Sequence, residues 1–271
     1  MLNGCQPVGI RKIADLGRIL VSPGRQIYGL AVIFSPEALE IPGILRTITD
    51  VLAKRGISIH HITGSSPLGG DVYILIFADF TGQNPYEVAR EVAKVAHVTD
   101  VEVIEPLVPG IVVDTITEMV TIGGERAIIM RKTFYKGLLG SLRKELGASA
   151  AAIFFHIGLR AGREAFESHL RMVGKRDRHL LVRVVEALWQ VVGFGKLEMV
   201  TVDAGRCYAR VRVYKNFECE LFKGSKEPQG YFTRGIIQGW LEKLLGCELR
   251  SKETKCIAVG DSYCEFTFTR G

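Results

Sequence analysis

The sequence has no long apolar run, and none of its stretches reaches the ~18 to 20 apolar residues that a helix needs to span a bilayer. Its first 25 residues also lack the continuous hydrophobic segment of a secretory signal. Charged side chains interrupt this stretch, namely Arg11, Lys12, Asp15, Arg18 and Arg25. We therefore expect a cytoplasmic protein that has no membrane partner.

Cysteines are too few and too unevenly placed for the dense framework of a secreted, disulfide-bonded domain. The chain of 271 residues has six cysteines, and five of them follow residue 200. We expect these cysteines to be buried thiols or metal ligands.

Common catalytic signatures are missing as well. The sequence has no Gly-x-Gly-x-x-Gly nucleotide loop, no P-loop and no Gly-x-Ser-x-Gly elbow. Its histidines do not have the spacing of a metal-hydrolase helix. Nothing in these patterns would hold a nicotinamide or a flavin, so we expect a protein that is not an enzyme.

The composition is that of a soluble globular protein, with 47% hydrophobic and 24% charged residues. The length suffices for two domains that each bury a core. A net charge of +6 favours anionic partners. Spread over the whole chain, this excess is better explained by a solvated surface than by nucleic-acid binding.

A hairpin is expected between Gly9 and Val21, with its turn at residues 15–17. This basic segment resembles the opening of AbrB-type DNA-binding hairpins, which implies contact with DNA as one alternative. Residues 22–25 lead directly into another domain and do not complete an AbrB unit, so an edge hairpin is favoured. We assign residues 1–26 to an N-terminal hairpin extension.

Residues 27–106 show strand and helix patterns in the order βαββαβ. The apolar positions Ile44, Leu45, Ile48, Val51 and Leu52 form one face of the first helix. Such a unit folds into a four-stranded antiparallel sheet with both helices on one face, the ferredoxin-like arrangement.

Two stretches of this unit carry a family resemblance: Ile-Pro-Gly-Ile-Leu at residues 41–45 and Arg-Gly-Ile-Ser-Ile at residues 55–59. They resemble an ACT domain, a family that commonly pairs with a second copy and binds an amino acid near the loop before the first helix. Exposed amides at a helix start attract a carboxylate, so Ile41, Pro42 and Gly43 are candidate ligand-binding residues. Because Glu40 and Ile41 replace the Asp or Asn of many amino-acid-binding members, a purely dimerising role stays open.

Two prolines and a glycine in residues 106–110 mark a short linker, which we place at 107–110. The second domain, 111–271, is expected to be α+β, with an antiparallel sheet and packed helices. Its expected elements are a hairpin at 112–131, helices at 134–146, 148–173 and 175–192, a hairpin at 197–214, a helix at 230–245 and a terminal hairpin.

The terminal hairpin brings two thiols and a carboxylate to one strand end. Gly260 supplies the positive φ of a tight turn, so Cys256 and Cys264 are expected opposite each other. Glu253 lies three residues before the first thiol. Thiolate and carboxylate ligands suit Zn²⁺. The two cysteines are equally consistent with small buried hydrophobic residues.

The pattern Glu-x2-Cys-x4-Asp-x2-Cys-x-Phe resembles the signature of the 4-vinyl reductase domain. That family is related in fold to a TRAPP vesicle-tethering subunit and to aromatic-sensing domains of bacterial activators. The resemblance implies that Glu253, Cys256 and Cys264 are zinc ligands. Zinc-binding members take a fourth ligand from a Cys near the start of the preceding helix, where this chain has Pro-Gln-Gly at 228–230. Cys219, Cys247, water and an empty site stay alternatives.

Relatives in that family enclose an apolar cavity for a small aromatic molecule or an acyl chain. Aromatic side chains on the helices and strands of the second domain suit such a ligand, although core packing explains each one singly. We select His156, Trp189 and Tyr208 as candidate ligand-binding residues.

These features predict a non-enzymatic, small-molecule-sensing regulatory protein that forms a homodimer. Its second domain binds a hydrophobic or aromatic molecule, and its ACT-like domain dimerises, with an amino acid as a possible second ligand. The alternatives are a one-component DNA-binding transcription regulator and an accessory factor or reductase in tetrapyrrole or aromatic metabolism.

Overall fold

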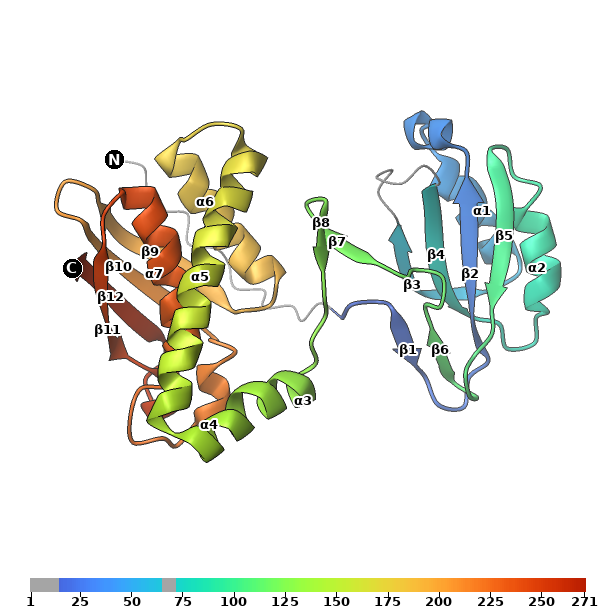
Figure 1. The fold of residues 1–271 in the computed structure, drawn as a ribbon. Helices are drawn as coiled ribbons and strands as arrows, with labels where there is room; N and C mark the ends of the chain where they lie inside the picture. Colours follow the sequence, from blue (N-terminus) through green and yellow to red (C-terminus); the bar gives the residue numbers. More distant parts are fainter. Residues whose placement is uncertain (1–14, 65–71) are drawn as a thin grey trace. The chain divides into compact units, whose positions relative to one another are not determined.

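The computed structural model describes residues 15–64 and 72–271 (Figure 1). The chain divides into two compact units, Met1–Ala127 and Ile128–Gly271. Both contain helices and antiparallel sheets, which confirms the expected α+β class. The expected strand at residues 9–14 lies outside the described residues. Within the described ranges, no helix has both the length and the hydropathy that a membrane crossing requires.

The main sheet of the first unit has four antiparallel strands in the order β3-β4-β2-β5. Its elements are β2 (Ile27–Phe34), α1 (Ile44–Lys54), β3 (Ser58–Gly64), β4 (Val72–Asp79), α2 (Pro85–Val92) and β5 (Val98–Ile104). The chain order and the strand order confirm the ferredoxin-like arrangement.

Alternating side chains of β2 serve two separate cores, because successive residues of a strand point to opposite faces. Leu30 and Val32 pack in one buried cluster with Ile48 of α1 and Val88 of α2. Both helices therefore lie on the same face of the sheet (Figure 1). Ile27 and its neighbours on the other face form a second cluster.

A short antiparallel ribbon of β1 (Ile19–Val21) and β6 (Ile111–Val113) contributes to this second cluster. Val112 is fully buried there, beside Ala31 and Phe77 of the sheet. Nε of Arg18 also donates to Oδ2 of Asp114 at 2.9 Å. This ribbon thus covers part of the sheet face opposite the helices.

The ribbon explains a difference from the expected domain boundary at 107–110. Residues 111–127 belong to the first unit, because β6 returns past the linker to pair with β1. The segment at 19–21 likewise pairs across the chain with 111–113. A local sequence pattern does not reveal such a long-range pairing.

The expected strands at 112–122 and 126–131 are shorter in the structure. Only β7 (Val120–Ile122) and β8 (Glu125–Ala127) form the hairpin, around Gly123 and Gly124. Oδ1 of Asp114 accepts bonds from the amides of Ile116 and Thr117. This local turn ends β6, because a backbone amide bound to an aspartate cannot join a strand ladder.

The loop before α1 contains a 3₁₀ turn, Pro36–Glu40, that the sequence analysis did not predict. The helix begins at Ile44, so Pro42 lies just before it and not in its first turn. Gly43 is the N-cap residue and has a φ of 90°, which favours glycine. An added Cβ at Gly43 would meet nothing within 4 Å, so backbone conformation alone requires this glycine.

The sheet of the second unit has the order β11-β12-β10-β9, again antiparallel. Its strands are β9 (Lys196–Asp203), β10 (Tyr208–Tyr214), β11 (Leu249–Lys255) and β12 (Cys264–Arg270). Its helical elements are α3 (Lys132–Tyr135), the π-helical turn η2 (Lys136–Ser141), α4 (Leu142–Leu146), α5 (Ala148–Val173), α6 (Arg178–Val191), the 3₁₀ turn η3 (Cys219–Phe222), α7 (Tyr231–Leu245) and the 3₁₀ turn η4 (Ile257–Val259).

Helices α5 and α7 lie side by side and approach through glycines (Figure 1). A Cβ at Gly162 would lie 2.0 Å from the carbonyl oxygen of Ile236, and one at Gly239 would lie 2.0 Å from that of Leu159. Only hydrogen fits at these positions, so the small residues of the 148–173 segment serve close helix packing.

The connection from β11 to β12 is wider than the expected tight turn. Gly260 has the predicted positive φ, at 108°. However, Oδ2 of Asp261 accepts the amide of Cys256 at 2.8 Å, which folds residues 256–263 into a loop that contains η4. The thiols of Cys256 and Cys264 still face each other across this loop.

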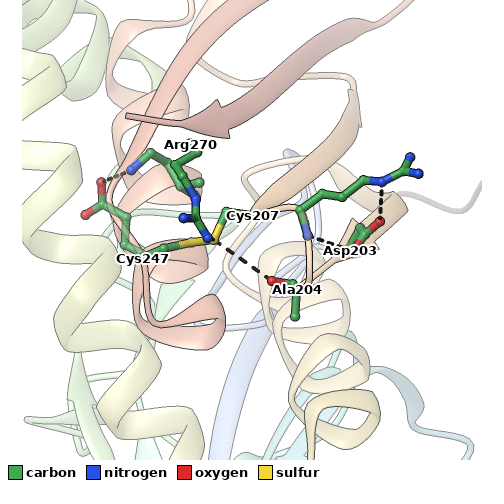
Figure 2. The surroundings of a disulfide bond; sticks show 8 residues. Asp203, Ala204, Cys207, Cys247 and Arg270 are labelled. Carbon is green, nitrogen blue, oxygen red and sulfur yellow. Dashed lines mark hydrogen bonds and ion pairs between the residues drawn. A yellow bond between two sulfur atoms is a disulfide. The ribbon is translucent and has the colours of Figure 1, made fainter.

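The expectation that the cysteines are thiols or metal ligands is wrong for two of them. Cys207 and Cys247 form a disulfide that links the start of β10 to the residues after α7 (Figure 2). Nη2 of Arg270 lies 3.3 Å from the sulfur of Cys207. The two partners are 40 residues apart, and only the fold brings them together. The pairing also removes Cys247 as a candidate metal ligand.

Candidate functional site

Four side chains from three parts of the second unit converge on one point. The ligand atoms of Cys219, Glu253, Cys256 and Cys264 all lie within 4.8 Å of one another. The three cysteines are fully buried. Three thiols and one carboxylate form a donor set that suits a four-coordinate, borderline-soft ion such as Zn²⁺. Of the alternatives for the fourth donor, Cys219 lies within this cluster.

Backbone geometry positions these donors. Cys219 begins η3, Cys256 follows the end of β11, and Cys264 begins β12. An irregularity in the β11–β12 register lies between Glu253 and Lys255. The Glu253 carboxylate thereby reaches Cys219, whose sulfur lies 3.8 Å from Oε1.

Backbone amides surround the two cysteines of the terminal loop. The sulfur of Cys256 accepts from the amides of Gln229 and Ala258, each at 3.4 Å. The sulfur of Cys264 accepts from the amide of Ile257 at 3.4 Å. Donors aimed at sulfur stabilise a thiolate, which is the form that binds a metal.

Electrostatics inside the cluster also favour a cation. Burial raises the pKa of Glu253 to about 9, and the neighbouring Cys256 thiolate adds to this effect. Hydrogen bonding to Cys256 and Cys264 raises the pKa of Cys219, whereas the bonds that Cys219 and Cys264 donate to Cys256 lower the pKa of that thiol. The four groups therefore cannot all lose their protons together unless a positive ion balances their charge.

Two carboxylates hold the start of α7, namely Glu253 of the cluster and the neighbouring Glu218. Oε2 of Glu253 accepts the amide of Gly230 at 2.9 Å. The buried Glu218 accepts the amides of Phe232 and Thr233 at 3.0 and 2.8 Å. These bonds satisfy amides that have no partner within the helix. Burial raises the pKa of Glu218 against the opposing effect of these bonds.

Near the start of α7, where relatives were expected to carry a fourth cysteine, this chain has Pro-Gln-Gly at 228–230, and Gly230 faces the cluster. A Cβ built there would lie 2.9 Å from Oε1 of Glu253, so a side chain at this position points into the cluster. Here the thiol comes from the other side, from Cys219 of η3. From the sequence, Cys219 is only one of several alternatives, because nothing in its spacing connects it to a motif 34 residues away.

A groove of about 810 Å³ lies next to the cluster. Its walls come from α3, η2, α4, the start of α5, η3 and the segment before α7. The lining residues are Thr133, Lys136, Gly137, Gly140, Ser141, Arg143, Lys144, Gly147, Ala148, Ala151, Leu221, Phe222, Glu227, Gln229 and Tyr231. Leu221 and Phe222 share η3 with Cys219, and the amide of Gln229 bonds to Cys256.

Arg143 is the most constrained charged side chain of the groove. Its guanidinium carbon lies 4.6 Å from the ring centres of both Phe222 and Tyr231. Its Nη1 donates to the carbonyl oxygen of Gln229 at 3.0 Å. No local sequence pattern points to Arg143, since only the fold brings together positions 86 residues apart.

The predicted ligand-binding residues of the second domain lie apart from one another. His156 is exposed on α5 and packs edge-to-face on Phe155. Trp189 of α6 is buried against Phe194, and Tyr208 begins β10. None of the three lines the groove. In the first unit, Ile41, Pro42 and Gly43 lie together in the partly exposed loop before α1.

Two family models match the chain. The ACT domain model matches residues 33–98, and the 4-vinyl reductase domain model matches residues 209–270. An uncharacterized protein of Methanocaldococcus jannaschii is 29% identical over 121 residues. This match covers 44% of the present chain and 65% of the length of the relative.

Solved structures resemble parts of this chain at low sequence identity. The phenol-responsive sensory domain of the transcription activator PoxR, solved with phenol, has a TM-score of 0.51 at 19% identity, over 56% of this chain and 80% of that one. A vinyl-4-reductase family protein from Methanocaldococcus jannaschii has a TM-score of 0.37 at 15% identity, over 54% and 84% of the two chains. The PoxR likeness shows a common fold. The two family models confirm both resemblances, and this chain contains an ACT domain followed by a 4-vinyl reductase domain.

Proposed function

We propose that this chain is a small-molecule-sensing regulatory protein whose 4-vinyl reductase domain binds a small hydrophobic or aromatic molecule. The groove beside the cysteine cluster carries this proposal. Its volume of about 810 Å³ is in the range of small-molecule sites, and Phe222 and Tyr231 supply aromatic walls. The PoxR sensory domain, which responds to phenol, supports the same ligand class.

Ligand binding is tested with phenol as the probe, by ligand-observed NMR on the full chain. Replacing Tyr231 by Ala removes one wall of the groove, so we expect the phenol signal to be lost. Tyr208→Ala serves as the matched control, because Tyr208 lies outside the groove. A phenol signal that survives Tyr231→Ala and disappears in Tyr208→Ala would place the ligand elsewhere.

We further propose that Cys219, Glu253, Cys256 and Cys264 hold one Zn²⁺. When bound, the ion supplies the positive charge that the buried donors need. It also ties η3 to the β11–β12 loop. Since η3 carries Leu221 and Phe222 of the groove wall, the metal has a structural role beside the ligand site.

Elemental analysis and native mass spectrometry of the purified chain test the metal. We expect one zinc per chain, retained in Cys247→Ser and lost in Cys219→Ser. If zinc is retained in Cys219→Ser but lost in Cys256→Ser, the terminal motif binds the metal and Cys219 is not a ligand. A chain that carries no zinc would contradict the whole assignment.

For the ACT domain, we propose a homodimerising role. The β1–β6 ribbon packs on part of the sheet face opposite the helices, and β3 and β5 are the edge strands of the sheet, so pairing through an edge strand is the arrangement that we propose. Sedimentation equilibrium of the full chain is expected to give a dimer. An amino acid at Ile41–Gly43 would shift the NMR signals of that loop.

We propose a non-enzymatic role in the cytoplasm. The reductase alternative predicts oxidation of a reduced nicotinamide by the purified chain. The DNA-binding alternative predicts an affinity that falls steeply with salt and disappears when residues 1–25 are deleted. Either result would replace the sensory proposal.

A further inference from the structure

The groove beside the cysteine cluster carries an excess of positive charge that a neutral phenol would not use. Lys136, Arg143 and Lys144 line it, against one carboxylate, Glu227. Among the described residues, no ion pair within 4.0 Å involves Lys136 or Lys144. The two ammonium groups therefore remain available to a ligand.

Arg143 differs from the two lysines because its position is fixed. It is half-buried, its guanidinium is held between the rings of Phe222 and Tyr231, and only one of its nitrogens donates to Gln229. A guanidinium has five N–H donors, so donors remain for a second acceptor. Its planar fork matches the two oxygens of a carboxylate.

The rest of the groove suits a flat apolar body. Gly137, Gly140 and Gly147 present no side chain, and Ala151 is a small buried residue. The ring of Tyr231 lines the groove, and the guanidinium carbons of Arg143 and Arg234 lie 4.6 Å and 5.3 Å from its centre. A cationic anchor thus lies beside an aromatic wall and a floor of small residues.

From this arrangement we propose that the groove takes a small aromatic carboxylate, with the acid group at Arg143, Lys136 and Lys144 and the ring against Tyr231. This inference rests on the proposed function, because it names the ligand class of the same site. It differs from that function in requiring a negative charge on the ligand.

Benzoate and benzamide provide matched probes, because they have the same shape and differ in charge. Isothermal titration of the full chain at pH 7.5 is expected to give about tenfold tighter binding for benzoate. Raising the salt from 50 mM to 500 mM should reduce this preference, because exposed charges are screened.

Variants locate the charge. Lys136→Gln and Lys144→Gln are each expected to lower the affinity for benzoate about threefold. The affinity for benzamide should stay unchanged. Lys252→Gln is the control, because it changes the net charge by the same amount at an exposed position of β11 outside the groove. It should leave the affinities for both probes unchanged.

The possible results separate the two proposals. Equal affinities for benzoate and benzamide would overturn the carboxylate inference and leave the sensing function intact. A benzoate preference that Lys252→Gln reduces as much as Lys136→Gln would overturn the assignment to the groove. If benzamide, benzoate and phenol all fail to bind, both proposals fall.

Discussion

At the scale of single residues, Gly230 decides how the carboxylate of the cysteine cluster is held. Its amide donates to Glu253, and its missing side chain leaves room for the two carboxylate oxygens. The φ of Gly230 is −84°, which any residue can adopt, so space and not backbone conformation requires glycine here.

Replacing Gly230 by Ala should therefore act on the metal. The new Cβ would lie 2.9 Å from Oε1 of Glu253 and 3.0 Å from Phe266, so the carboxylate must move. We expect zinc affinity to fall by about tenfold, as for other losses of support around a metal ligand. Competition with a chromophoric chelator measures this. Gly137→Ala is the control, because its added Cβ meets nothing within 4 Å, and equal affinities in the two variants would contradict the argument.

Asp79, at the end of β4, makes a pH-dependent contribution to stability. Its carboxylate accepts bonds from the amide and hydroxyl of Thr81 and from Arg25. The Thr81 bonds, and then the Arg25 bond, lower the pKa of Asp79 to about 2. A carboxyl whose pKa is lowered on folding stabilises the fold above its unfolded pKa of about 4, and this contribution is lost as the pH falls through about 2.

The variant Asp79→Asn tests this contribution. We expect it to lower the stability of the first unit by about 1 kcal/mol at pH 7, since solvent screens the half-exposed Arg25. The difference in Tm from the unmodified chain should shrink between pH 4 and pH 2. Calorimetry at several pH values measures it, and a difference that stays constant down to pH 2 would exclude this role.

At the scale of elements, the closest packing lies between α5 and α7. Glycine in a helix interior is usually unfavourable, so an Ala substitution normally stabilises by up to about 1 kcal/mol. At Gly162 an Ala substitution should destabilise the fold instead, because the added Cβ would lie 2.0 Å from a carbonyl oxygen of α7.

For Gly162→Ala we expect a loss of about 1 to 3 kcal/mol in the stability of the second unit, the usual range for overpacking. Chemical denaturation followed by tryptophan fluorescence reports on this unit, which contains Trp189 and Trp240. Gly140→Ala is the matched control, since its nearest neighbour would be a lysine side chain at 3.8 Å. Equal stability of the two variants would show that α5 and α7 can separate without penalty.

At the scale of the whole molecule, the disulfide and the cysteine cluster both belong to the unit Ile128–Gly271. The disulfide closes a loop of 40 residues that contains Cys219 and α7. Closing such a loop restricts the unfolded chain and typically stabilises a fold by about 2 to 4 kcal/mol.

A phosphine reductant breaks the disulfide, so it should lower the Tm of the second unit. We expect calorimetry to show two transitions, of which only this one shifts. The transition of the first unit is expected to stay in place. The variant Cys247→Ser should show the same lowered Tm of the second unit, and the reductant should not lower this Tm further. A shift of similar size in Cys247→Ser on adding reductant would assign the effect to other cysteines.

The sequence by itself determined most of the longer helices and strands and the two domain families, because local periodicity and short motifs carry that information. The apolar run of β2 and the apolar face of α1 predicted the ferredoxin-like unit. The Glu-Cys-Cys pattern at 253–264 predicted three members of the cluster.

Only the tertiary structure decided which distant residues meet. It brought Cys219 to the cluster, paired Cys207 with Cys247, returned β6 to β1 and placed Arg143 between Phe222 and Tyr231. These contacts join segments far apart in the chain, and their formation depends on the packing of whole helices and strands. Such packing cannot be predicted from a local sequence pattern, whereas the residues of a strand or a helix show the periodicity of that element.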